Sequence, residues 1–275
     1  MSGPHGVWRG GEAVLQDSYG AMAEFHDLFM VEPWDELRSH VRAAFGGLPA
    51  EAIIVEIGAG SGIGTRVIAQ ETRARVFALE PDLVMRAILT ARVADDPELA
   101  SRVTVVAGAV PADLGRLPER VDGFVCAHML GHLAESDRRA LFAWLATHLS
   151  DDGTGLVTVH WPRREVGGSP DETNGANDAG GGNDADGSGG DVVEVRTLGE
   201  YEYRARHHAP DRPDESRSSY EVWRGEVMLR RYTFTSAWRI VTTEVISTDL
   251  AASLSIEPSG SHVALIRRTA DAPDA

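Results

Sequence analysis

The sequence contains no lysine, so every basic side chain apart from the histidines is an arginine. This absence excludes lysine Schiff-base chemistry, and it excludes the phosphate loop of nucleotide hydrolases, which requires a lysine. The single cysteine, Cys126, excludes an internal disulfide and a zinc site made of several cysteines. No stretch approaches the roughly 18 consecutive apolar residues that indicate a membrane-spanning helix.

The charge of the chain is strongly one-sided. Aspartate and glutamate number 42 against 26 arginines, which gives a formal net charge of −16. Such a chain, without a basic block, should be repelled by nucleic acid and by anionic membranes, so we expect neither as a partner. The first residues, MSGPHGVWRGG, lack the basic-then-apolar pattern of a secretory signal. We therefore expect a cytoplasmic protein.

Between residues 46 and 162, short apolar runs alternate with amphipathic stretches. The short runs predict strands at 52–58, 74–80, 102–108, 121–128 and 155–161. The amphipathic stretches predict helices at 62–72, 81–96 and 136–153. This alternation is typical of a parallel sheet with helices on both faces, in which ligands bind beyond the carboxyl ends of the strands.

The flanking segments have other patterns. Residues 17–45 have helical periodicity, with a break expected near Pro33. Residues 165–191 are about a third glycine, too polar to order themselves, and predict a mobile loop that is either a lid or an inert surface expansion. Beyond it, alternation of period two over 192–240 predicts an antiparallel sheet.

The stretch VEIGAGSGIGT, residues 55–65, follows the first predicted strand and has a glycine at every second position from Gly58 to Gly64. The dinucleotide fingerprint needs a third glycine five residues after the first. Starting from the first three glycines in turn, that place is held by Ile63, Thr65 or Val67. The dinucleotide pattern therefore fails in every register.

Two acidic residues point to a different ligand. Glu56 lies two residues before the first glycine, where a carboxylate opposes a phosphate but attracts an ammonium or a hydroxyl group. The start of the helix after the loop can offer N–H groups to a carboxylate. Glu80 ends the next predicted strand, where an acid can accept hydrogen bonds from both ribose hydroxyls. Taken alone, Glu80 also suits NAD; with the failed fingerprint it favours S-adenosylmethionine (SAM).

Four motifs, VEIGAGSG, FALEPDLVMRAIL, VVAGAV and VDGFVCAHMLGHL, resemble in order those of class I SAM-dependent methyltransferases. The resemblance covers residues 17–162 and 241–268. It implies an α/β fold, with a Rossmann-like doubly wound seven-stranded sheet whose last strand is antiparallel, plus an inserted antiparallel β subdomain. The expected organisation is a helical lid (1–45), a SAM-binding core (46–162), a disordered loop (163–191), a β cap (192–240), a closing helix and hairpin (241–268) and a disordered tail (269–275).

The resemblance also implies which residues contact SAM. The methionine part is expected at Glu56, Gly58, Ala59, Gly60 and Gly62, the ribose at Glu80, and the adenine at Pro81 and Met85, with Val110 and Ala127 completing the site. Where the family usually has an adenine-binding aspartate, this chain has Ala109, so that contact falls to the backbone near Val110 or to Asp113. The segment HDLF, 26–29, resembles the family's lid motif with His26 in place of tyrosine, and Tyr19 could compensate.

Methyl transfer needs alignment of the acceptor more than a strong base, although a hydroxyl acceptor benefits from one. The candidates lie just past predicted strand ends, His128 and His132 after the fourth strand and His160 after the fifth. We take His128 as the preferred base, with cavity lining as its alternative, and His132 as catalytic, structural or SAM-adjacent. The two have the spacing of a metal pair, but Gly131 intervenes and no third ligand is evident, so no metal is expected.

The sequence thus predicts an enzyme that transfers a methyl group from SAM to N, O or C of a small, natural-product-like acceptor. The alternatives are a protein methyltransferase and a non-catalytic SAM-binding regulatory or partner subunit. Aromatic residues of the β cap could wall an acceptor pocket or pack against their own core; they are Tyr201, Tyr203, Tyr220, Trp223, Tyr232 and, just beyond, Trp238. Exposed aromatics on such a sheet could also pair two chains as a homodimer.

Overall fold

The structure is a computed structural model that describes residues 13–14, 18–160, 192–208, 212 and 214–269. The loop expected at 163–191 and nearly all of the expected tail lie outside these residues. The chain divides into two compact units, one of 1–29 with 183–237 and one of 30–182 with 238–275. Among the described residues, no helix has the length and apolar character needed to cross a membrane.

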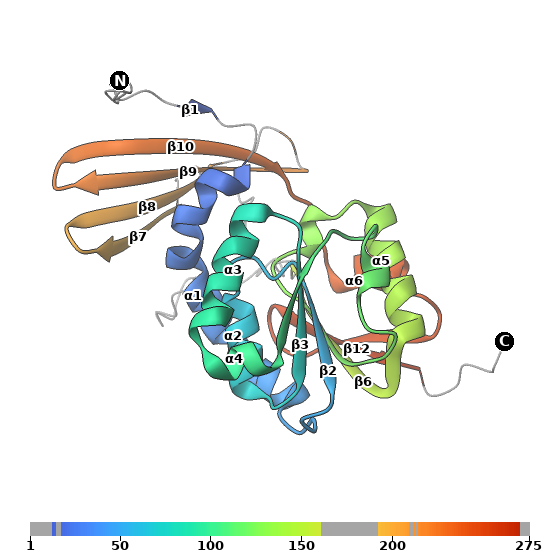
Figure 1. Ribbon diagram of the computed structural model, residues 1–275. Coiled ribbons are helices and arrows are strands. Elements are labelled where there is room, and N and C mark those ends of the chain that lie inside the picture. The colour runs from blue at the N-terminus through green and yellow to red at the C-terminus, as the bar shows by residue number, and fades with distance from the viewer. Residues whose placement is uncertain (1–12, 15–17, 161–191, 209–211, 213, 270–275) are drawn as a thin grey trace, which may run out of the picture. The chain divides into compact units, whose positions relative to one another are not determined.

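The larger unit contains a seven-stranded sheet with strand order β11-β12-β6-β5-β2-β3-β4 (Figure 1). Strand β12 is antiparallel to both neighbours, and the other pairs are parallel. The predicted fold class is therefore confirmed. The strands are β2 (Ile53–Ile57), β3 (Arg75–Glu80), β4 (Val103–Ala107), β5 (Val121–Cys126), β6 (Leu149–Thr158), β11 (Leu254–Pro258) and β12 (Val263–Arg268).

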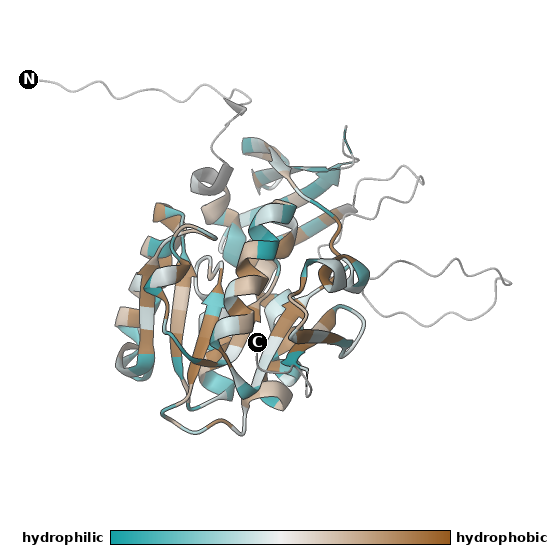
Figure 2. Ribbon diagram, turned by 90° about the vertical axis from the view of Figure 1, so that its right-hand side faces the viewer, coloured by the Kyte–Doolittle hydropathy of each residue, from teal (hydrophilic) through white to brown (hydrophobic). Residues whose placement is uncertain are grey.

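Helices cover both faces of this sheet (Figure 1). One face packs against α2 (Ile63–Glu71), α3 (Leu83–Asp95), α4 (Pro97–Arg102) and the C-terminal part of α1 (Ser18–Phe45). The other packs against α5 (Glu135–His148) and α6 (Thr243–Asp249). The central strands are apolar on both sides, as a sheet covered twice requires (Figure 2).

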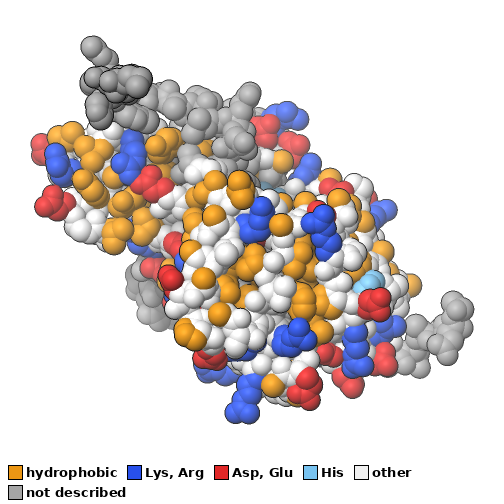
Figure 3. Space-filling model, viewed as in Figure 1, with side chains coloured by type: hydrophobic (Ala, Val, Ile, Leu, Met, Phe, Trp, Pro, Cys, Tyr) orange, Lys and Arg blue, Asp and Glu red, His pale blue; other side chains and the backbone are white. Residues whose placement is uncertain are grey.

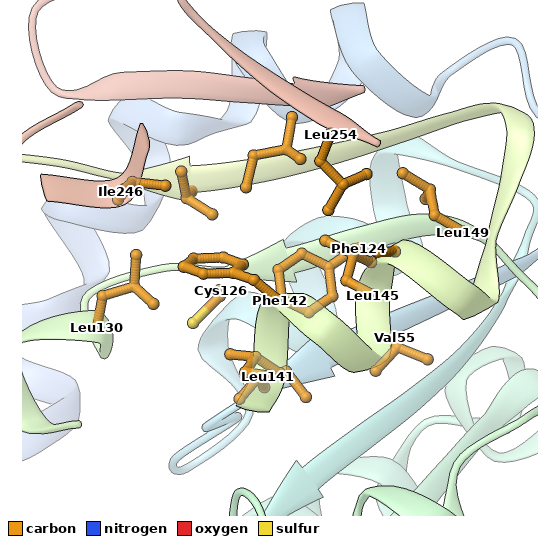
Figure 4. Close-up of a cluster of buried hydrophobic side chains, with 14 of the residues drawn as sticks. Val55, Phe124, Cys126, Leu130, Leu141, Phe142, Leu145, Leu149, Ile246 and Leu254 are labelled. Atoms are coloured by element: carbon orange, nitrogen blue, oxygen red, sulfur yellow. The ribbon is translucent and has the colours of Figure 1, made fainter. Parts of the chain in front are cut away.

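Alternation along β2 decides which face each side chain reaches. Val55 belongs to the cluster on the α5 face, with Phe124 and Phe142 (Figure 4). Ile54 belongs to the cluster on the α1 and α2 face. Because successive side chains of a strand point to opposite faces, Glu56 lies on the α1 and α2 face.

Two helix boundaries differ from the sequence expectation. Helix α1 runs through Pro33 without the predicted break. Proline removes one helical hydrogen bond, but buried Trp34 and Leu37, which follow it, give the helix a packed face. Helix α5 ends at His148 rather than at Gly153, because Leu149 already pairs with Val121 of β5. Strand pairing here overrides the local helical pattern.

The smaller unit contains a five-stranded sheet of order β1-β10-β9-β8-β7. The last four strands form the predicted antiparallel ladder, and the short β1 joins β10 in parallel. The strands are β1 (Ala13–Val14), β7 (Val192–Leu198), β8 (Tyr201–His208), β9 (Glu215–Arg224) and β10 (Val227–Ala237).

Several aromatics of this sheet pack around the N-terminal part of α1. The Phe25 ring lies 5.2 Å from Tyr220, 5.8 Å from Tyr203 and 6.1 Å from Tyr232, measured between ring centroids. Trp223 instead donates from Nε1 to the buried Glu221 carboxylate at 2.7 Å. Within this unit, these rings serve the sheet's own packing.

Arginines and carboxylates are interspersed over the face of the molecule in view in Figure 3. Most are partly exposed, as in the pair of Arg102 and Glu98 at 2.7 Å. Among the described residues, one ion pair with both side chains buried joins α5 to α6. Arg138 Nε lies 2.8 Å from Asp249 Oδ2, with only 5% and 1% of the two side chains exposed.

Asp249→Ala should destabilise the larger unit by about 3–5 kcal/mol, because it leaves the buried guanidinium of Arg138 without its charge partner. Urea denaturation followed by circular dichroism measures this loss. Glu135→Ala is the matched control, since Glu135 forms an exposed pair with Arg139, and should cost less than about 1 kcal/mol. Equal losses in the two variants would show that the α5–α6 pair is not a structural tie.

Candidate active site

The glycine loop after β2 turns sharply at the carboxyl edge of the sheet. Gly58 has φ 70° and Gly62 has φ 87°, left-handed values that a side chain rarely tolerates. A Cβ at Gly58 would come within 2.5 Å of Met129 Cγ, and one at Gly62 within 2.5 Å of Leu89 Cδ1. Both glycines are therefore required by the turn and by its close neighbours.

The loop is anchored to β3. The N–H groups of Gly58 and Ala59 both donate to the carbonyl of Leu79, at 2.9 and 3.0 Å. Gly60 N donates to Glu80 Oε2 at 2.7 Å. These three groups are used inside the protein. The helix that follows, α2, begins at Ile63 without a side-chain cap, so its first turn retains donors for an anionic group.

Glu56 is a fully buried acid on the α1 and α2 face of β2. Its Oε2 accepts a hydrogen bond from Thr65 Oγ1 at 2.5 Å, whereas its buried Oε1 has no hydrogen-bond partner among the described residues. Burial, with a smaller contribution from the charge of Glu80, raises the pKa of Glu56 to about 8. The carboxyl group of Glu56 is therefore mainly protonated at neutral pH.

Gly64, the last glycine of the run, leaves room for two side chains. A Cβ at this position would overlap the indole of Trp34 and Oε1 of Glu56. Trp34 comes from α1 and is only 6% exposed. No sequence pattern indicates this role, because glycine in a first helical turn has no signature of its own and Trp34 is distant along the chain.

Glu80 lies at the end of β3 with both oxygens engaged by the backbone. Oε2 accepts from Gly60 N, and Oε1 accepts from Asp82 N at 2.8 Å. A carboxylate oxygen has two lone pairs, so each can accept a further hydrogen bond from a hydroxyl group. Glu80 therefore links the glycine loop to the start of α3 and remains suited to a ribose.

The predicted adenine side has a different arrangement from the family pattern. Asp113 accepts from Ala109 N at 2.9 Å and pairs with Arg116 at 3.0 Å, so its carboxylate holds the turn after β4. Val110, in the same turn, is half-buried. Of the two adenine contacts expected after β3, Pro81 is exposed, whereas Met85 is a buried residue of α3. Two exposed apolar residues lie between them and were missed from the sequence, namely Leu83 and Val84.

The loop after β5 begins with buried Ala127 and continues into a strained residue. His128 has φ 54°, an uncommon value for a residue with a side chain, and its N–H donates to Thr158 Oγ1 at 2.7 Å. Its ring lies 5.8 Å from the ring of Trp34 in a T-shaped arrangement. The structure thus brings His128 beside the residue that covers Glu56.

His132 belongs to a second aromatic group, beyond the ends of β5 and β6. Its ring lies 4.7 Å from that of Trp238, and the His160 ring lies 5.5 Å from Trp238 on another side. Gly131 allows this approach, since a Cβ there would come within 2.9 Å of the Trp238 indole. Trp238 follows β10 along the chain, so its place beside His132 could not be read from sequence spacing.

Burial lowers the pKa of His160, and its Nδ1 accepts from Val241 N at 3.3 Å. The ring is therefore neutral near pH 7, with its proton on Nε2.

The described residues contain no group of three or more His, Cys, Asp or Glu side chains that could hold a metal. His26 lies in the smaller unit, with Nδ1 3.2 Å from Asp27 Oδ1, while the side chain of Tyr19 lies outside the described residues.

The residues present fit a zwitterionic nucleoside. The unpartnered Oε1 of Glu56 suits an ammonium, the uncapped start of α2 suits a carboxylate, and Glu80 suits vicinal hydroxyls. A phosphate would be repelled by Glu56 once ionised and by Glu80.

Residues 54–153 match a protein family described as "Methyltransferase domain". The matched segment runs from β2 into β6 and includes the glycine loop, Glu80 and the loop after β5. The predicted methyltransferase resemblance of the core is thus confirmed. A comparison with curated proteins finds no significant match.

Solved structures share the fold at low sequence identity. Streptomyces venezuelae DesVI has 15% identity and a TM-score of 0.64, over 93% of this chain and 100% of that one. CalS10 from Micromonospora echinaspora, described as an amino pentose methyltransferase involved in calicheamicin biosynthesis, has 17% and 0.61, over 94% and 100%. KedS8 from Streptoalloteichus, described as a sugar N-methyltransferase, has 14% and 0.54, over 98% and 99%. At these identities the likeness establishes the fold.

Gly64→Ala should destabilise the protein by about 1–3 kcal/mol, because the added methyl displaces Trp34 or the Glu56 carboxyl from a packed site. Chemical denaturation measures the loss. Gly47→Ala is the control, since a Cβ at Gly47 meets nothing within 4 Å, and should change stability by less than about 1 kcal/mol. Equal stability of the two variants would contradict the close packing at Gly64.

Proposed function

We propose that this chain, whose core carries a methyltransferase domain, is a SAM-dependent methyltransferase that acts on a small natural-product acceptor. An amine-bearing sugar is the acceptor class to test first. The observation that carries the proposal is the presence of one acid near the end of each of two neighbouring strands, Glu56 on β2 and Glu80 on β3, around one glycine loop. We choose this acceptor because CalS10, described as an amino pentose methyltransferase, and KedS8, described as a sugar N-methyltransferase, share the fold.

On the cofactor side, the residues bind rather than react. Glu56 would hold the ammonium, the start of α2 the carboxylate, and Glu80 the ribose hydroxyls. SAM supplies a methyl group on a positively charged sulfur, which an aligned nucleophile displaces in line. Because the chemistry needs alignment above all, rigid anchoring of the loop on Leu79 and Glu80 is the chain's main contribution here.

We assign a cofactor side and an acceptor side from the strand order. Glu80 ends β3, on one flank of β2, while β5 and β6 lie on the other flank. If the nucleoside extends toward β3, the acceptor approaches over β5 and β6. That flank carries Trp238, His132 and neutral His160. We propose Trp238 as the acceptor wall and His132 as the group that accepts a proton, with His128 closer to the cofactor.

The neutral state of His160 bears on the acceptor. An amine reaches the site largely as a cation and must lose one proton before it can attack. A charged imidazole would repel a cationic amine, whereas a neutral ring and an indole do not.

The non-catalytic SAM-binding alternative is favoured by one observation. Asp113 holds its own turn, close to the place where the family binds adenine.

A transfer assay separates these functions. Methyl-labelled SAM is incubated with the protein and a panel of amino sugars, hydroxylated sugars and peptides, and product is identified by mass spectrometry. We expect label on an amino sugar nitrogen. Label on a peptide alone would favour protein methylation, and SAM binding without any transfer would favour the non-catalytic subunit.

Glu80→Gln should weaken the preference for a ribose with both hydroxyls. In the wild type, S-adenosylhomocysteine should bind about 10-fold more tightly than its 2′-deoxy analogue, as loss of a hydrogen bond to a charged group implies. In the variant that ratio should fall toward one. Calorimetric titration measures all four affinities, with Glu98→Gln, an exposed residue of α4, as control. An unchanged ratio in Glu80→Gln would show that the ribose lies elsewhere.

Trp238→Ala should raise KM for the acceptor about 10-fold while changing the Kd of S-adenosylhomocysteine less than about 2-fold, because the indole lies on the acceptor flank. His132→Asn should lower kcat about 100-fold with little change in KM, as expected when a proton acceptor is lost. Steady-state kinetics and titration measure both. A loss of cofactor affinity in either variant would place these residues on the wrong side of the site.

A further inference from the structure

Trp34 contacts both halves of the cofactor site from outside the matched domain. It lies on α1, before residue 54, and its ring reaches the first turn of α2 at Gly64 and the His128 ring at 5.8 Å. The same gap at Gly64 is bounded by Oε1 of Glu56. One buried indole therefore borders the acid near the end of β2 and the histidine after β5.

Apolar side chains flank Glu56 on this face of the sheet. Trp34 belongs to the cluster that includes Ile54, Ile63 and Val125, which flank the acid on β2, α2 and β5. Thr65 satisfies one carboxyl oxygen, and the other is buried without a hydrogen-bond partner among the described residues. A buried unsatisfied acceptor costs free energy that a donor on a ligand can recover.

We propose that Trp34 is a positioning residue of the cofactor site, whose indole keeps water from the Glu56 carboxyl so that the unpartnered oxygen is left for the ligand's ammonium. This inference rests on the proposed SAM-dependent function and adds a residue to its site. A smaller side chain at this position would admit water to Oε1, and the acid would then behave as a solvated one.

The titratable groups that neighbour Glu56 come from two strands, although Cys126 lies on the opposite, α5 face of the sheet. Glu80 on β3 adds negative charge, and with burial it accounts for the raised pKa of about 8. From β5, burial keeps the pKa of the Cys126 thiol well above its usual value, so it stays neutral, and His128 lies beyond it against Trp34. Thr65 on α2 and Trp34 on α1 carry no charge.

A proton balance follows from this arrangement. Below pH 8 the empty site holds Glu56 protonated, whereas a bound ammonium favours the carboxylate. Binding therefore releases the carboxyl proton to solvent, and affinity rises with pH until the pH passes the pKa of the empty site. From a pKa of about 8, we expect release of about 0.9 proton at pH 7 and binding up to about 50-fold weaker at pH 6 than at pH 8.

The test titrates S-adenosylhomocysteine into the full chain at pH 7 by calorimetry, in two buffers with different ionisation enthalpies, and repeats the Kd at pH 6 and pH 8. Glu56→Gln gives the baseline without this proton. Trp34→Leu should release less than about half of the wild-type proton count and lose most of the pH dependence. Trp34→Phe, which keeps a ring over the carboxyl, should stay near the wild type.

Trp144→Leu is the matched control, since this half-buried indole packs on α5 against His148 and does not touch Glu56. It should retain the wild-type proton release. A melting curve confirms that each variant is folded, and Trp34→Met replaces Trp34→Leu if the latter is not. The inference is overturned if the wild type binds without proton release, or if Trp34→Leu releases as many protons as the wild type. Either result leaves the proposed function standing. Absence of wild-type binding at millimolar ligand overturns both.

Discussion

The site depends on one constraint, a carboxyl group buried at the carboxyl end of β2. Glu56 cannot be hydrated there, so its neighbours must supply what water does not. Thr65 provides one hydrogen bond, and the indole of Trp34 closes the rest of the space that Gly64 leaves open. The second oxygen has no hydrogen-bond partner in the part of the chain that the structure describes, an arrangement that suits a cationic donor.

The same constraint ties separate parts of the chain together. Helix α1 contributes Trp34, α2 contributes Thr65 and Gly64, and β3 contributes Glu80, whose carboxylate holds the glycine loop through Gly60. A change at any of these positions acts on the acid through packing or charge. Binding of the ligand is thus expected to depend on residues that do not touch it.

The strand order gives this acid two different flanks. The chain proceeds from β2 outward to β3 and β4, then returns to place β5 on the opposite flank of β2. Loops at such a reversal diverge and leave space for a ligand. On the β3 flank lies Glu80, and on the β5 and β6 flank lie Trp238, His132 and His160.

The sequence by itself determined the fold class, the glycine loop and the two acids, because each of these is local: strand periodicity, glycine spacing and an acid at a strand end can be read within a few residues. Only the tertiary structure decided what surrounds them. Trp34 meets Gly64, Trp238 meets His132, and Asp113 holds the Ala109 turn. Helix α1 also continues through Pro33. These outcomes depend on which elements pack together, and a contact between segments distant along the chain leaves no local pattern in either one.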